Sequence, residues 1–89
     1  MIYLIDHQDS FTWNVQHQFS NFDEVYCSNY FEINENKLKN SKVIVFSPGP
    51  GSPKDYPLTS KIYNKYKGTK KIIGICLGYQ LILHNEKGI

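Results

Sequence analysis

The sequence predicts an α/β domain in which a parallel sheet is covered by helices on both faces. Short apolar runs at residues 2–5, 43–46 and 71–75 are rich in β-branched and aromatic side chains, as is typical of buried strands. Stretches with helical spacing of apolar residues lie between these runs. Strands that alternate with helices build parallel sheets, and no internal repeat or low-complexity segment points to another architecture.

The first strand ends at Asp6, where the apolar run stops. A helix should follow it, capped by Asp9 or Ser10. Apolar residues recur at every fourth position of this helix, which predicts one face packed on the sheet. They are Phe11, Val15 and Phe19.

The rest of the chain continues the alternation. A weaker strand at residues 24–27 and a short helix around residues 35–39 precede the strand at residues 43–46. The next helix begins at Pro57 and stops at Gly68. Its apolar side is formed by Leu58, Ile62 and Tyr66. The strand at residues 71–75 runs directly into Cys76, and a helix over residues 78–84 follows.

Length and charge limit the classes of function. With 89 residues, 40% of them hydrophobic, the chain can form one domain or part of one. The net charge is +2, and the charged residues are scattered along the chain, so neither a nucleic acid nor a membrane is expected as a partner. The Tyr- and Lys-rich segment at residues 61–71 is similar to single-stranded nucleic-acid contacts, but a solvated helix face explains it more simply.

The cysteine content favours a reducing compartment. Only Cys27 and Cys76 occur, no signal peptide precedes them, and no apolar run approaches the ~20 residues that span a bilayer. We therefore expect a soluble cytoplasmic protein.

Cys76 is the candidate nucleophile. Gly74 and Gly78 flank it in a tight turn between a buried strand and a helix, where larger side chains would collide with their neighbours. The helix N-terminus favours a thiolate, and the backbone N–H of Leu77 can stabilise an oxyanion. Cys27 lacks these features and is interpreted as a small buried hydrophobic residue.

The Pro-Gly-Pro-Gly loop at residues 48–51 follows another strand and would lie at the same sheet edge as Asp6 and Cys76. By itself it could be an ordinary turn. Its position favours a second role, because its glycines let the backbone approach a ligand closely. The N–H groups of Gly49 and Gly51 could then complete an oxyanion hole with Leu77.

Three motifs resemble those of the class I glutamine amidotransferases. Residues 74–80, Gly-Ile-Cys-Leu-Gly-Tyr-Gln, look like the G-[IV]-C-x-G-x-Q nucleophile motif, and residues 47–53 resemble the glycine-proline oxyanion loop. Residues 6–14 are similar to the D-x-x-D-S-F-T-x-N signature of one branch, the small subunits of anthranilate synthase and aminodeoxychorismate synthase. The motifs occur in the family's order across nearly the whole chain, which implies a truncated flavodoxin-like amidotransferase fold over residues 1–89.

The resemblance implies that Cys76 attacks the side-chain amide of glutamine, releases ammonia and leaves a γ-glutamyl thioester that water converts to glutamate. The ammonia would pass to a chorismate-using synthase subunit of tryptophan or folate biosynthesis. No cofactor or metal is implied. The residues expected to hold the oxyanion and bind glutamine are Gly49, Pro50, Gly51, Leu77 and Gln80. Asp9, Ser10 and Asn14 are interpreted equally well as structural caps or as contacts with the synthase.

The sequence also departs from the family pattern. Tyr79 stands where many relatives have His, and residues 85–89 are polar where relatives continue with an apolar, glycine-rich segment. The family's catalytic His and Glu belong further downstream, so the 89-residue chain alone is expected to be inactive. Of its own histidines, His7 is the least implausible base, because it follows the first strand at the same edge. An incomplete sheet would leave a strand edge unpaired, so self-association is expected.

Two other interpretations remain open. The chain can be a folded remnant or binding module of the same fold without catalysis. It can also be a flavodoxin-like or receiver domain, in which acidic residues after the first strand bind a metal or phosphate. Neither the Gly-Pro-Gly loop nor the cysteine turn is required in such a domain, which argues against the last interpretation.

Overall fold

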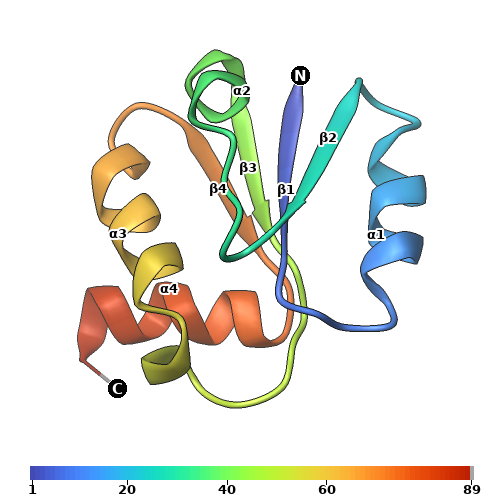
Figure 1. Ribbon diagram of the computed structural model, residues 1–89. Coiled ribbons are helices and arrows are strands. Elements are labelled where there is room, and N and C mark those ends of the chain that lie inside the picture. The colour runs from blue at the N-terminus through green and yellow to red at the C-terminus, as the bar shows by residue number, and fades with distance from the viewer. Residues whose placement is uncertain (89) are drawn as a thin grey trace.

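A computed structural model describes residues 1–88 as a four-stranded parallel sheet with helices on both faces (Figure 1). The strands are β1 (Ile2–Asp6), β2 (Val25–Asn29), β3 (Val43–Phe46) and β4 (Lys71–Gly74). Their order in the sheet is β2-β1-β3-β4, and every neighbouring pair is parallel. The helices are α1 (Thr12–Phe19), α2 (Glu35–Asn40), α3 (Pro57–Tyr66) and α4 (Leu77–Lys87), with a 3-10 turn η1 (Pro53–Asp55) before α3. The predicted fold class is confirmed.

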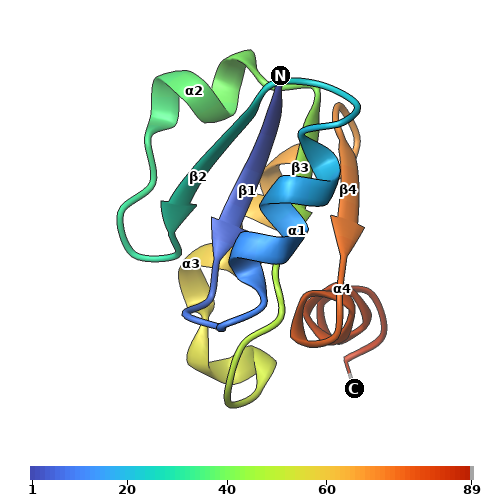
Figure 2. The same cartoon turned by 90° about the vertical axis from the view of Figure 1, so that its right-hand side faces the viewer.

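The sheet separates two apolar cores (Figures 1 and 2). Alternate residues of a strand point to opposite faces, so Tyr3 and Ile5 enter one core while Ile2 and Leu4 enter the other. The larger core is covered by α2, α3 and α4, and the smaller by α1 alone. The face covered by α1 leaves Ile73 and Ile75, near the β4 edge, only partly buried.

Helix α1 packs on the sheet through Val15 and Phe19, as expected, but not through Phe11. Phe11 is 63% exposed and precedes the helix, whereas Thr12 and Val15 are buried against the sheet. The Thr12 hydroxyl donates to the Asp6 carboxylate over 2.9 Å, which fixes the first turn of α1 beside the end of β1. The expected apolar position at Phe11 was therefore wrong, because a polar bond to Asp6 orients the helix.

Helix α3 also differs from its predicted apolar side. Leu58 is exposed, and the buried residues are Thr59, Ile62 and Tyr63. The helix ends at Tyr66, two residues before the expected stop at Gly68, which is not in the left-handed conformation of a glycine cap.

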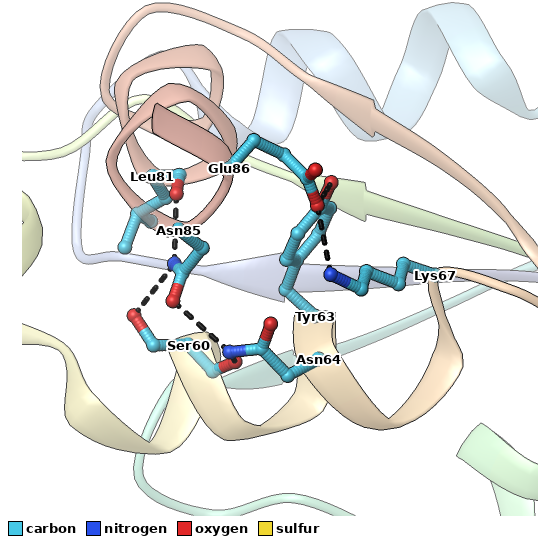
Figure 3. Close-up of polar contacts among 7 residues, drawn as sticks. All are labelled: Ser60, Tyr63, Asn64, Lys67, Leu81, Asn85 and Glu86. Carbon is cyan, nitrogen blue, oxygen red and sulfur yellow. Dashed lines mark hydrogen bonds and ion pairs between the residues drawn. The ribbon is translucent and has the colours of Figure 1, made fainter. Parts of the chain in front are cut away.

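Helix α4 is longer than predicted. Polar side chains near its C-terminal end form hydrogen bonds with α3 (Figure 3). The Asn85 amide donates to the Ser60 hydroxyl and accepts from Asn64. The Glu86 carboxylate accepts from the Tyr63 hydroxyl over 2.8 Å and pairs with Lys67 over 3.0 Å. The polar residues 85–87, expected to lie beyond the helix, instead belong to it, because α3 supplies partners for Asn85 and Glu86.

None of the helices within residues 1–88 is both long enough and apolar enough to cross a membrane.

Candidate nucleophile site

The segments that carry the three motifs meet at the carboxyl ends of neighbouring strands. The N–H of Ser47, directly after β3, donates to the Ile5 carbonyl of β1 over 3.1 Å. The N–H of Ile75, directly after β4, donates to the Phe46 carbonyl over 3.1 Å. The ladder therefore continues beyond the strands and holds the loop and the cysteine turn together at one edge, as predicted.

Cys76 occupies a strained turn between β4 and α4. Its φ is 54° and its ψ is −110°, a region that residues with a side chain rarely adopt, and the residue is exposed to solvent. This backbone turns the thiol outward at the helix N-terminus, as in a nucleophile elbow.

The flanking glycines permit this turn. A Cβ at Gly74 would lie 2.5 Å from the Gly78 carbonyl, and a Cβ at Gly78 would lie 2.3 Å from the Phe46 carbonyl oxygen. The contacted atoms are backbone and cannot rotate away. The strand, the turn and the helix therefore approach to a distance that only glycine allows.

The loop at residues 47–53 touches Leu77, the residue after Cys76. A Cβ at Gly49 would lie 2.9 Å from the Leu77 Cδ2 and 2.5 Å from the His7 Cβ, so Gly49 is seated between these two side chains. Within residues 1–88, no described group accepts a hydrogen bond from the backbone N–H of Gly49, Gly51 or Leu77. These three N–H groups thus lack a partner among the described residues, and Gly49 lies against Leu77, the residue that follows Cys76.

The far end of the loop is fixed by short-range bonds. Gly51 has a φ of +84°, the left-handed conformation that favours glycine. The Asp55 carboxylate accepts from the Ser52 N–H over 2.9 Å, and the Tyr56 hydroxyl donates to the Pro50 carbonyl over 2.5 Å. The loop is therefore held at both ends while its middle remains accessible.

The remaining predicted site residues differ in how they are held. Gln80 is exposed in the first turns of α4, and its N–H donates to the Cys76 carbonyl over 3.1 Å. The Asp9 carboxylate accepts from the Phe11 N–H over 2.7 Å and closes the turn before α1. The N-cap of α1 is Phe11, which makes no side-chain cap hydrogen bond, so the expected helix cap at Asp9 or Ser10 was wrong. Ser10 and Asn14 are exposed, and their side chains have no hydrogen-bond partner among residues 1–88.

His7 does not face the site as a base would. It is fully buried, and its two ring nitrogens lie 3.1 Å from the Ser47 carbonyl and 3.0 Å from the Thr59 hydroxyl. Burial lowers the pKa of His7 to about 4, although the hydrogen bond to Ser47 and the Asp6 carboxylate act in the opposite direction. Its expected role as the least implausible base is therefore wrong. The other histidines lie on α1, where His17 stacks on Trp13, and two turns beyond Cys76 on α4.

Sequence reasoning missed the supports of the loop. Thr59 and Tyr56 are buried and bond to His7 and Pro50 respectively, yet neither belongs to a recognisable motif. The one signal that could have indicated this support was a polar residue, Thr59, within the apolar side of α3, because a buried hydroxyl requires a hydrogen-bond partner.

A parallel sheet with a strained, exposed cysteine at a strand-to-helix turn defines an α/β protein of the nucleophile-elbow class. The chain belongs to the family described as glutamine amidotransferase class-I, whose model matches residues 3–87.

Curated relatives are similar in sequence over almost the whole chain. The chain is 38% identical over 84 residues to anthranilate synthase component 2 of Lactococcus lactis, an alignment that covers 93% of this chain and 42% of that protein. It is 36% identical over 94 residues to anthranilate synthase component 2 of Buchnera aphidicola, covering 99% of this chain and 48% of the relative. The chain therefore spans about half the length of these relatives or slightly less.

The fold is also found in a solved structure. A Thermoplasma acidophilum protein described as a subunit of GMP synthase superposes with a TM-score of 0.75 at 20% identity, covering 97% of this chain and 44% of that one. At this identity the likeness supports the fold alone.

Proposed function

We propose that this chain is the N-terminal, nucleophile-bearing part of a single glutamine amidotransferase domain that supplies ammonia to a chorismate-using synthase. The observation that carries the proposal is the conjunction of two structures at one edge. The strained turn at Cys76 exposes a thiol, and the loop at Gly49 packs against the adjacent Leu77. Family membership and the component 2 relatives support glutamine as the substrate and a synthase subunit as the partner.

The chemistry follows from the positions of these groups. The Cys76 thiolate attacks the amide carbon of the glutamine side chain, so that a carbon–sulfur bond forms and the carbonyl oxygen becomes an anion. The N–H groups of Gly49, Gly51 and Leu77 stabilise that anion. Collapse of the intermediate breaks the carbon–nitrogen bond, and the departing nitrogen takes a proton to leave as ammonia. Water then releases glutamate from the thioester.

The departing nitrogen must take a proton from a donor. His7 cannot supply it, because both of its ring nitrogens are engaged in the core. We infer that the 89 residues form the acyl-accepting half of the site and that a histidine from elsewhere in the complete fold completes it. A cytoplasmic location belongs to this proposal and is supported by the two free cysteines.

An assay of glutamate release tests the proposal directly. The 89-residue chain is compared with the same chain extended through the second half of the domain, each with and without the synthase partner. General acid–base catalysis contributes 10²–10⁴-fold, so the short chain should turn over glutamine at least about 100-fold more slowly than the extended one. Equal turnover would show that a local group replaces the histidine. Absence of activity in both, together with no reaction of Cys76 with electrophilic glutamine analogues, would favour a non-catalytic remnant instead.

A further inference from the structure

The oxyanion loop rests on two buried aromatic side chains. The backbone N–H of His7 donates to the Ser47 hydroxyl over 2.8 Å, and the Nδ1 of its ring lies 3.1 Å from the Ser47 carbonyl. The Tyr56 hydroxyl donates to the Pro50 carbonyl over 2.5 Å. The first residue of the loop is thus bonded to one ring and its fourth residue to the other, while Gly49 lies between them against the His7 Cβ.

The two rings also contact each other. The centroids of His7 and Tyr56 lie 4.7 Å apart with planes at 81°, an edge-to-face contact. Tyr30 packs against Tyr56 in the same manner, at 4.8 Å and 82°. His7 and Tyr56 are respectively 0% and 5% exposed. The brace, defined here as His7 and Tyr56, is therefore part of the closely packed interior, and movement of either ring would be transmitted to the loop.

The hydrogen bonds indicate the tautomer of the neutral His7 ring. A carbonyl only accepts, so the Nδ1 facing the Ser47 carbonyl carries the proton. The Nε2 then accepts from the Thr59 hydroxyl. Every polar atom of the neutral ring has a partner in this tautomer, and the residue is suited to hold geometry rather than to exchange protons.

We propose that His7 and Tyr56 are positioning residues, which hold the N–H groups of Gly49 and Gly51 where the oxyanion of the acyl-transfer step forms. This inference rests on the proposed function of Cys76. Oxyanion donors act only when they lie at hydrogen-bond distance from the developing charge, and a displacement of about 1 Å can cost 10²-fold in rate. The brace supplies that precision to a loop that otherwise has no regular secondary structure.

The test compares two reactions of the same thiol. The p-nitrophenyl γ-ester of glutamate acylates Cys76: the sulfur forms a thioester and p-nitrophenolate leaves with the bonding electrons, so no proton donor is required. Iodoacetamide alkylates the same sulfur by displacing iodide and forms no oxyanion. The ratio of the acylation rate to the alkylation rate therefore reports the loop and not the reactivity of the thiol.

Tyrosine substitutions provide a matched pair. Tyr56→Phe removes only the hydroxyl that bonds the Pro50 carbonyl. Tyr63→Phe removes the hydroxyl of another buried tyrosine, which bonds Glu86 between α3 and α4 (Figure 3). We expect Tyr56→Phe to lower the ratio about tenfold or more and Tyr63→Phe to change it less than twofold. His7→Ala should behave like Tyr56→Phe, and His7→Asn, which keeps a donor near the Nδ1 position, should restore much of the ratio.

The outcomes separate the two proposals. If the unmodified chain is acylated no faster than its Cys76→Ala variant, the proposed function fails and the role of the brace falls with it. If the chain is acylated but Tyr56→Phe and Tyr63→Phe give the same ratio, the positioning role is refuted while the function stands. A parallel fall of acylation and alkylation would also refute it, because the defect would then be general. Thermal melts accompany each variant, and where His7→Ala does not fold, Tyr56→Phe decides.

Discussion

Replacing Gly78 by Ala should destabilise the protein strongly, because the elbow has no room for a methyl group. The new Cβ would lie 2.3 Å from the Phe46 carbonyl oxygen and 2.7 Å from the Phe46 Cβ. Phe46 is fully buried and belongs to β3, so it cannot move without disturbing the sheet. Overpacking of this kind costs about 1–3 kcal/mol and sometimes more, and it exceeds the gain of up to about 1 kcal/mol from placing Ala in a helix.

The chain contains a matched control. A Cβ at Gly68 would meet nothing within 4 Å, and Gly68 does not adopt a positive φ. Gly68→Ala should therefore change the free energy of unfolding by less than about 0.5 kcal/mol, or raise it slightly by restricting the unfolded chain. The two substitutions are chemically identical and differ only in what surrounds them.

Thermal unfolding followed by circular dichroism measures the difference. A loss of about 2 kcal/mol corresponds to a fall in Tm of about 8–16 °C for a domain of this size, and the Gly68 variant should stay within about 4 °C of the parent. In the Gly78 variant, iodoacetamide should also lose its preference for Cys76 over Cys27, since Phe46 immediately precedes the loop. If Gly78→Ala melted within a few degrees of Gly68→Ala, the close approach of α4 to β3 would not be required and the elbow argument would be refuted.

Three further predictions concern His7, the thiols and the loop. The pKa of His7 is about 4 in the fold against about 6.5 when unfolded, so its stabilising contribution is complete above pH 6.5 and is lost as the pH falls towards 4. The difference between these pKa values corresponds to about 3 kcal/mol of stability. The free energy of unfolding, measured with urea between pH 4 and 6.5, should therefore rise less steeply with pH in His7→Asn than in the parent chain. Limiting iodoacetamide at neutral pH should label exposed Cys76 at least about tenfold more than Cys27, since burial and the Asp6 carboxylate raise the pKa of Cys27 to about 11. Peptide mapping that found the label mainly on Cys27 would contradict the assignment of Cys76 to a nucleophile elbow. Gly51→Val should weaken binding of a glutamine analogue more than it lowers Tm, because it strains a backbone of φ +84° in a loop that contributes little to the core. Equal losses in a binding titration and in a thermal melt would indicate a purely structural turn.

The sequence by itself determined the elements of the fold and the position of the candidate nucleophile. Apolar runs separated by helical patterns are local features, and they located all four strands within about two residues. The glycines around Cys76 encode a tight turn through their missing side chains, so the elbow could be predicted without knowing its neighbours. The Pro-Gly loop was predicted for the same reason.

Only the tertiary structure decided which faces are buried and how the loop is supported. Phe11 fits an apolar helix face by spacing, yet the Asp6 carboxylate draws Thr12 inward and leaves Phe11 exposed. His7 had the sequence position of a base, yet Ser47 and Thr59 enclose it from residues 40 and 52 positions away. Such contacts depend on where distant segments meet, and a pattern read along the chain does not contain that information. The physical reason is that a polar side chain is stabilised by the partner that satisfies its hydrogen bonds, and here those partners were assembled by the sheet.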